Sequence, residues 1–193
     1  MSTSALVMVL RTVSLLAFVG PMLLGAGGRH RESGTGAPRY GRGRAAVVAN
    51  LAAFGLFVLS LMIRPGPAGD VTALWLAGAG SIVAVAGAAL VLKARSELGS
   101  AWSLVPGAGR ETGLVTTGPY RLVRHPIYLG LGLLAMGQAL AFRSWPAFLI
   151  VLFGVVPTFA WRARGEEALL SRAFGERYAL YRKHTRMIIP YLL

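Results

Sequence analysis

Two short polar clusters interrupt an otherwise apolar chain and carry residue types that could do chemistry. The first is Arg124-His125-Pro126-Ile127-Tyr128, which opens directly onto a long apolar segment. Because a proline disfavours helical geometry at the preceding residue and suits the first turn of a helix, we expect His125 to be extended at a helix start. The free N–H groups of that turn can bind an anion, and Arg121 and Arg124 would add charged donors. The alternative is that these residues only anchor a helix end at a membrane interface.

The second cluster consists of Arg162, Glu166 and Glu167. Arg162 and Glu166 are four residues apart, so on a helix they face the same way. In a region otherwise rich in cations, the two carboxylates could hold a cationic group of a ligand. They could equally form surface ion pairs with Arg162 or Arg164, and such pairs contribute little stability.

The two clusters flank a predicted helical hairpin. Apolar segments 127–142 and 145–161 are joined at Arg143-Ser144-Trp145-Pro146, a short turn. A short connection makes neighbouring helices antiparallel, so the far ends of the hairpin, at Pro126 and Trp161, come near one another. Both clusters therefore converge on that end.

The convergence predicts a pocket with an anion-binding helix start on one side and carboxylates on the other. Tyr120 and Tyr128 would supply flat surfaces suited to a purine or a ribose. Such a pocket suits a zwitterionic ligand that carries an aromatic base. S-adenosylmethionine fits this description.

Composition places these elements in a membrane. Of the 193 residues, 55% are hydrophobic, and they occur in blocks that cover residues 5–26, 45–63, 71–92, 127–142 and 145–161. The first three blocks approach the roughly 20 residues that cross a bilayer, and the last two are shorter. We therefore predict an all-α integral membrane protein with about five transmembrane helices and a single domain, 1–193. Three spans fall in 1–92, and 93–193 is the cofactor-binding part.

Other function classes find little support in the composition. The chain has no cysteine, which excludes disulfides, thiolate metal sites and cysteine nucleophiles. Its histidines, His30, His125 and His184, are not paired at metal-ligand spacing. The net charge is +13, but the arginines fall between apolar blocks and form no basic arm with interleaved aromatics, so we expect no nucleic-acid partner. Oligomeric state is not predictable from these features.

The distribution of positive charge predicts the orientation. All but three of the 20 Lys and Arg residues follow the first, third or fifth block, and the exceptions are Arg11, Arg64 and Arg143. The positive-inside rule then puts the N-terminus outside and the C-terminal tail in the cytoplasm, with anionic lipid headgroups around the basic residues. The first block has no basic region before it, so we expect a retained span, in which Arg11 reaches the outer interface. The Ala, Gly and Arg bias favours a bacterial inner membrane.

Two further patterns concern packing. Small residues line one face of each of two blocks: Ala77, Gly80, Ala84, Gly87 and Ala88 in the third, and Gly130, Gly137 and Ala141 in the fourth. Such faces allow close helix approach. After Trp161, apolar and aromatic residues recur every three or four positions, at Leu170, Phe174, Tyr178 and Tyr181, which predicts an amphipathic tail on the membrane or over the hairpin. Gly175 should interrupt that helix.

The motifs as a whole resemble the isoprenylcysteine carboxyl methyltransferase family, which is itself similar to the phospholipid N-methyltransferases. The resemblance rests on residues 114–128, Arg162-x-x-x-Glu166-Glu167-x-x-Leu170, Phe174-Gly175-Glu176-x-Tyr178-x-x-Tyr181, the closing Ile189-Pro190, and the lead-in Leu98-Gly99-x-x-Trp102-Ser103. It covers the C-terminal half of the chain.

This resemblance implies S-adenosylmethionine bound between the last two spans and the C-terminal segment, with a lipophilic acceptor entering from the bilayer. Carried over by position, the cofactor pocket would be lined by Tyr120, Arg124, His125, Pro126, Tyr128, Glu166 and Glu167. Arg162 would orient an anionic acceptor or steady the reacting groups, and Glu166 is the second candidate catalytic residue. A carboxylate acceptor needs no general base, whereas a thiol or an amine would need one, and Glu166 or His125 would be the nearest.

Two other functions stay open. Integral membrane sterol reductases resemble this family in their C-terminal region and hold a nicotinamide cofactor in a similar pocket, although their chains are much longer. The other alternative is a non-enzymatic membrane protein, such as a small channel or an assembly factor. An intramembrane charge would favour transport, but the spans contain almost none.

Overall fold

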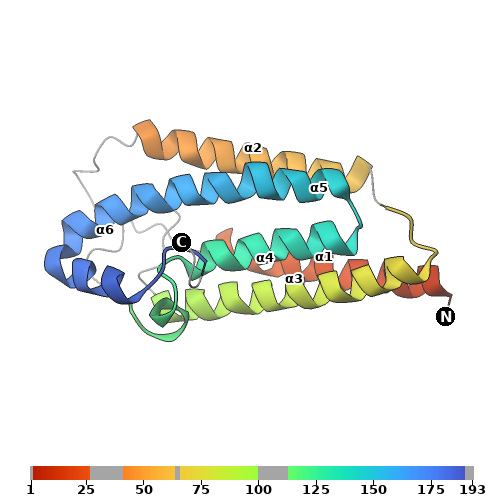
Figure 1. Cartoon of the computed structure of the whole chain (residues 1–193), viewed down its shortest axis with the longest axis horizontal. Helices are drawn as coiled ribbons and strands as arrows, with labels where there is room; N and C mark the ends of the chain where they lie inside the picture. Colours follow the sequence, from red (N-terminus) through yellow and green to blue (C-terminus); the bar gives the residue numbers. More distant parts are fainter. Residues whose placement is uncertain (1, 27–40, 64–65, 100–112, 190–193) are drawn as a thin grey trace.

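Helices aligned along one long axis make up the computed structural model, which describes residues 2–26, 41–63, 66–99 and 113–189 (Figure 1). They are α1 (Thr3–Ala26), α2 (Gly41–Ile63), α3 (Val71–Leu98), α4 (Pro126–Ala141) and a long rod that runs through α5 (Trp145–Ile150), η4 (Val151–Val155) and α6 (Val156–His184). The short helix η3 (Gly118–Arg121) precedes α4. The all-α prediction with five long helices is therefore confirmed. Of the residues named in the sequence analysis, His30, Arg64, Trp102, Ser103 and Pro190 lie outside the described ranges, as do four of the arginines counted for the orientation, Arg29, Arg31, Arg39 and Arg110.

Glycines on both helices allow α3 and α4 to pack closely. A Cβ atom on Gly137 would lie 2.6 Å from the carbonyl oxygen of Gly80, and one on Gly87 would lie 2.7 Å from that of Gly130. No side chain fits at such distances, so the two backbones touch. The predicted small-residue faces are confirmed, and they pack as expected for helices that gain no hydrophobic free energy from leaving lipid.

The predicted hairpin turn lies at Phe142–Ser144. The hydroxyl of Ser144 accepts from the N–H of Ala147 at 3.4 Å and caps α5, and Arg143 adopts a positive φ of 51°. Asp70 caps α3 in the same way and accepts from Arg143 at 2.8 Å. Both helix starts are thus fixed at the same end of the molecule.

The side chain of Arg11, which we expected to reach the outer interface, is buried against backbone carbonyl groups. Its side chain is 8% exposed, and it donates to the carbonyl oxygens of Ala141 and Gly66 at 3.0 Å and of Phe142 at 3.3 Å. The last carbonyls of a helix have no partner within the helix, and a cation there also meets the negative end of the helix dipole. Arg11 therefore caps the end of α4 from α1.

The rod from α5 to α6 continues well past Trp161, where the apolar block ends. Gly175 has φ 51° and ψ −124°, so the predicted interruption of the helix is confirmed, and the last turns fold back toward the start of α4 (Figure 1). One π-helical turn, η4, lies within the rod. The tail is not simply laid on a surface, because Tyr178 is completely buried.

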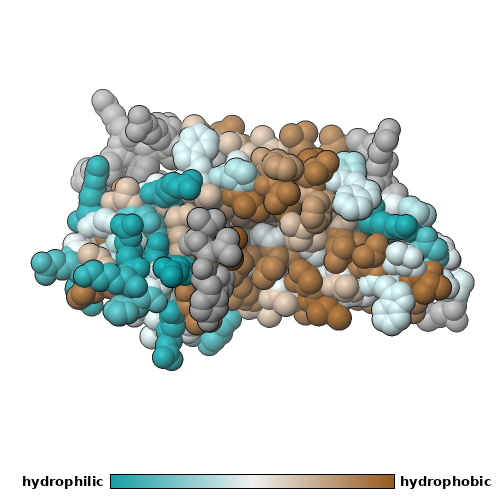
Figure 2. Space-filling view, viewed as in Figure 1, coloured by the Kyte–Doolittle hydropathy of each residue, from teal (hydrophilic) through white to brown (hydrophobic). Residues whose placement is uncertain are grey.

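The surface is divided by polarity along the long axis. Hydrophilic residues gather around the folded-back end of α6, and apolar residues cover the middle (Figure 2). Exposed tryptophans mark the two limits of this belt, Trp75 and Trp145 toward one end and Trp161 toward the other. Tryptophan prefers the interface between lipid and water. By length and composition, Val71–Leu98 and Trp145–His184 are each able to cross a membrane.

Candidate functional site

Segments far apart in the sequence meet at the polar end of the molecule. His125 precedes α4, and Glu166 and Glu167 lie on α6 beyond the apolar belt. Nδ1 of His125 is 3.6 Å from Oε2 of Glu166, and its Nε2 is 3.8 Å from Oε1 of Glu167. The predicted convergence of the two polar clusters is therefore confirmed.

The backbone next to the imidazole is held from two sides. Pro126 begins α4 as predicted, and His125 lies outside the helix with φ −124° and ψ 61°, less extended than expected for a residue before proline. The N–H of His125 donates to the carbonyl of Met187 at 2.9 Å, and the N–H of Arg124 donates to that of Arg186 at 2.8 Å. The segment after α6 thus closes over this side of the site.

Glu166 receives donors from several side chains. The hydroxyl of Tyr128 donates to its Oε1, and so does Nε of Arg162 at 3.2 Å. Burial acts to raise the pKa of Glu166, but the hydrogen bonds and charges of His125, Tyr128 and Arg162 outweigh it and leave the pKa below its ordinary value. Glu166 is therefore a carboxylate at neutral pH.

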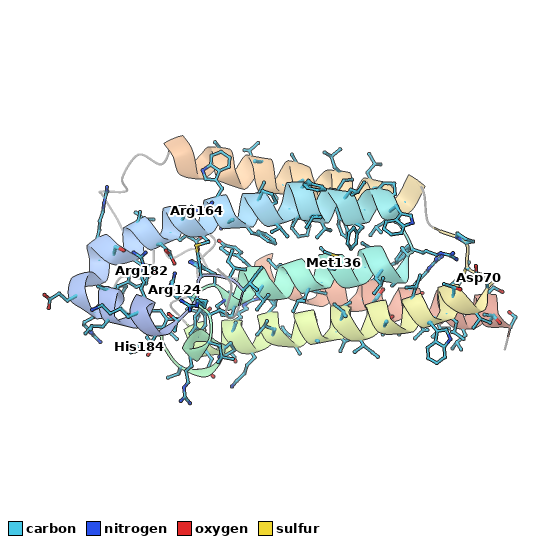
Figure 3. All side chains as sticks on the ribbon, viewed as in Figure 1. Asp70, Arg124, Met136, Arg164, Arg182 and His184 are labelled. Atoms are coloured by element: carbon cyan, nitrogen blue, oxygen red, sulfur yellow. The ribbon has the colours of Figure 1, made fainter. Side chains whose placement is uncertain are left out.

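Arg124 and Glu167 form a buried ion pair, with Nε 2.6 Å from Oε1 and side chains only 9% and 12% exposed. The guanidinium of Arg124 also donates to the carbonyl oxygens of Thr185 and Arg182. Figure 3 shows the side chains of Arg124 and Arg182 at this end of the molecule. The expectation that Arg124 offers open donors to an anion is therefore not met in this conformation, because the protein itself takes them up. Arg121, the other expected donor, is exposed.

Tyr128 is enclosed rather than open. Its ring stacks with His125 at a centroid distance of 5.6 Å and with Phe159 of α6 at 5.2 Å, and the guanidinium carbon of Arg162 lies 5.7 Å from the ring centroid. The side chain is buried. The expected flat surface for a purine is thus taken up by the protein's own rings, and Tyr128 orients Glu166 and His125 instead.

Tyr120, the other expected flat surface, is buried in η3 as well. Its carbonyl accepts from the hydroxyl of Tyr181 at 2.7 Å, which ties η3 to the tail. On the other side, Thr117 donates to Glu97 near the end of α3 at 2.8 Å. Tyr120 therefore holds the segment that leads to His125 and presents no open ring.

Two buried polar atoms in this region have no hydrogen-bond partner among the described residues: Nε2 of His125 and the hydroxyl of Tyr178. Buried polar groups are nearly always paired, so such atoms commonly mark where a ligand or an ordered water binds. Burial raises the pKa of Tyr178, which keeps its phenol protonated. A ligand that carries polar and cationic groups fits this donor and acceptor set.

Sequence reasoning missed Phe159 and Tyr178 as parts of the site. Phe159 lies three and seven residues before Arg162 and Glu166, so the helical period alone could have placed it on their face. Tyr178 was recognised only as part of an apolar stripe, because its burial depends on the backbone reversal at Gly175. Within the residues that the structure describes, no cluster of His, Asp and Glu could hold a metal ion.

Comparison with known proteins assigns the chain to a family. The model described as phospholipid methyltransferase matches residues 75–177, more than half of the chain. The chain belongs to the phospholipid methyltransferase family. This family and the related isoprenylcysteine methyltransferases are S-adenosylmethionine-dependent membrane enzymes that act on lipophilic acceptors.

Curated relatives share only part of their length with this chain. The Protein-S-isoprenylcysteine O-methyltransferase of Schizosaccharomyces pombe is 36% identical over 77 residues, which are 40% of this chain and 33% of the relative. The Nickel-cobalt-cadmium resistance protein NccN of Alcaligenes xylosoxydans xylosoxydans and the Cobalt-zinc-cadmium resistance protein CzcN of Cupriavidus metallidurans are each 34% identical over 98 residues. Those residues are 49% of this chain and 45% and 44% of the two relatives, so the chain spans less than half the length of each relative.

The fold has a solved counterpart. The eukaryotic intramembrane Ras methyltransferase ICMT superposes with a TM-score of 0.62 at 21% sequence identity, over 93% of this chain and 64% of that chain. The similarity confirms the predicted fold: this is an integral membrane protein with an all-α, ICMT-like arrangement of helices.

Proposed function

We propose that this protein transfers a methyl group from S-adenosylmethionine to a lipophilic acceptor at the cytoplasmic face of a bacterial plasma membrane. The observation that carries the proposal is the meeting of buried His125 with the partly buried carboxylates of Glu166 and Glu167 at the start of α4. There, Nε2 of His125 and the hydroxyl of Tyr178 have no hydrogen-bond partner among the described residues. Within this proposal the part from residue 93 onward binds the cofactor, and the three helices before it form the scaffold. The basic residues around α6 keep the tail in the cytoplasm and the N-terminus outside.

The site residues keep the roles that their sequence motifs suggest, with adjustments from the geometry. The proposed pocket is lined by Tyr120, Arg124, His125, Pro126, Tyr128, Glu166 and Glu167. Glu167 and the open side of Glu166 provide negative charge for the cationic groups of the cofactor. Arg124 and Tyr128 act mainly by holding these carboxylates in place. Arg162, beside Glu166, is nearest to the membrane-facing side of the cluster.

S-adenosylmethionine would supply an electrophilic methyl group on a sulfonium. Transfer of that group is an in-line displacement, so this chain's contribution is to align the acceptor and to exclude water. The tail does the latter, because residues 185–188 cover the site and pair with the segment before α4. Arg162 and Glu166 then fix the approach of the acceptor.

An apolar groove supports the choice of a lipophilic acceptor. It has a volume of about 600 Å³ and lies between α2 and the α5–α6 rod, with Ala52, Ala53, Phe153 and Gly154 in its wall. The groove reaches Trp161, the neighbour of Arg162. A single hydrocarbon chain could lie in it.

Transfer of a labelled methyl group into a total lipid and metabolite extract tests the proposal. The purified protein in lipid nanodiscs should label at least one extractable lipid, which mass spectrometry then identifies. Glu167→Gln should lower this labelling strongly, whereas Glu176→Gln, a matched change at an exposed position of α6, should not. Equal labelling by both variants would contradict the placement of the site.

A further inference from the structure

The rod of α5, η4 and α6 buries residues at an interval that a regular helix does not keep on one side. Before Gly175, the buried residues of the rod are four positions apart throughout: Ala147, Val151, Val155, Phe159 and Ala163. In a regular α-helix each residue turns the chain by about 100°, so a spacing of four moves round the helix by about 40° at each step. Over the whole series the buried face would turn by about 160°, to nearly the opposite side of the rod.

The π-helical turn η4 removes most of this rotation. The N–H of Val156 donates to the carbonyl of Val151, five residues back, whereas the N–H of Val151 donates to that of Ala147, four residues back. A π turn thus holds one residue more than an α-helical turn, and the helix after it points as if that residue were absent. This takes about 100° from the rotation, so the buried side chains before and after η4 stay on one side of the rod.

Pro157 explains why the wide turn occurs at this point of the chain. Its nitrogen has no hydrogen to donate, and in a regular helix its ring would collide with the carbonyl of Phe153, four residues before it. The surplus residue faces outward, because Leu152 and Phe153 are 42% and 73% exposed while Val151 and Val155 are completely buried. The turn therefore adds its residue on the apolar surface and leaves the core side unchanged.

The direction in which the rod presents its side chains decides whether the polar end of the molecule forms. Phe159 stacks on Tyr128 of α4 at a centroid distance of 5.2 Å, and Glu166 accepts from the Tyr128 hydroxyl and lies 3.6 Å from Nδ1 of His125. If the same sequence formed a regular α-helix with Ala147 in its present place, Glu166 would point about 100° away from α4. It would then meet neither Tyr128 nor His125.

We propose that η4 is a positioning element for the candidate site and that Pro157 is the positioning residue that favours it. Its one surplus residue turns Glu166 and Glu167 toward His125, although η4 lies in the apolar belt and touches none of them. This inference rests on the proposed function, because the direction of the carboxylates matters to activity only if they bind the cofactor. π turns inside α-helices are frequent at functional sites, and here the turn acts from a distance along the helix.

Two single-residue deletions, each combined with Pro157→Ala, test the proposal on chains of equal length. Deletion of Leu152 removes the surplus residue, so the rod becomes a regular α-helix whose two parts keep their present faces. Deletion of Ala160, beyond η4, instead turns Glu166 by about 100° relative to Phe159. In lipid nanodiscs, calorimetric titration should show S-adenosylhomocysteine binding within about threefold of the wild type for the Leu152 deletion. For the Ala160 deletion we expect a lower melting temperature and affinity at least about tenfold weaker.

Gly154→Ala is the control for a change in η4 that keeps its number of residues. Its Cβ would lie 3.6 Å from that of Ala53, an ordinary contact, so we expect wild-type binding. Unfolding or loss of binding in the Leu152 deletion variant, or equal binding by the two deletion variants, would overturn the inference. Failure of the wild type to bind S-adenosylhomocysteine would instead contradict the proposed function. In that case the melting temperatures of the two deletion variants would still test the role of η4 in directing the rod.

Discussion

At the scale of single residues, the buried pair of Arg124 and Glu167 stands out because it links the proposed site to the tail. We predict that Arg124→Gln destabilises the protein by about 3 kcal/mol, since it leaves Glu167 buried without its partner and the carbonyl of Thr185 without a donor. Thermal unfolding in detergent measures this. Arg121→Gln, at an exposed position nearby, should change the melting temperature little. Equal changes in melting temperature for the two variants would show that the ion pair of Arg124 and Glu167 contributes no stability.

Glu166 makes a second prediction at this scale, for the dependence of stability on pH. Its pKa in the folded protein lies below its ordinary value of 4.5, so the stability it contributes is present above that value and is lost as the pH falls through the lower, folded pKa. The melting temperature of the wild type should therefore fall more steeply on acidification than that of Glu166→Gln. Identical slopes for both proteins below pH 4.5 would contradict the hydrogen bonding described for Glu166.

At the scale of helices, the contact between α3 and α4 depends on glycines that leave no room for a side chain. Gly137→Ala should destabilise the protein by about 2–3 kcal/mol, because its Cβ would collide with the backbone of α3. Gly132→Ala on the same helix meets nothing within 4 Å and should be neutral or stabilising by about 0.5–1 kcal/mol. Thermal unfolding of the two variants side by side checks the difference in sign. A stabilising Gly137→Ala would mean that the helices are further apart than described.

The groove between α2 and the α5–α6 rod makes another prediction at this scale. Ala52→Trp should fill part of the groove and raise the KM for a long-chain acceptor about tenfold with little change in kcat, since bound-chain contacts are lost equally in ground and transition states. Val58→Trp, exposed on the same helix but outside the groove, is the control. A similar KM for both variants would show that the acceptor chain does not bind in this groove.

At the scale of the whole molecule, some of the architecture could be predicted from the sequence and some could not. The contact of His125 with Glu166 and Glu167 could be predicted from the short turn. Two helices joined by such a turn pack antiparallel, so their far ends lie close together. Gly175 was predicted to break the last helix, but no rule gives the direction of the chain after such a break. The closure of the tail over the site and the burial of Tyr178 were therefore not predictable.

Arg11 shows the same limit. A single arginine near the end of an apolar block is expected to reach the interface, because the sequence does not reveal which backbone groups lie nearby. The structure places the end of α4 beside it, and the guanidinium donates to three carbonyl oxygens there. Likewise, the sequence shows that Tyr120 and Tyr128 have flat aromatic rings, but it does not show what covers them. In the structure Phe159 stacks on Tyr128, and Tyr181 of the tail bonds to the backbone of Tyr120.

The proposed function depends on one binding event at the polar end of the molecule. Calorimetric titration of the purified protein with S-adenosylhomocysteine tests it most directly, with NADPH as the competing ligand class. We predict saturable binding of S-adenosylhomocysteine at one site, at least about tenfold weaker in Glu167→Gln and unchanged in Glu176→Gln, and no binding of NADPH. Absence of S-adenosylhomocysteine binding, or binding of NADPH at the same site, would contradict the proposed methyltransferase function.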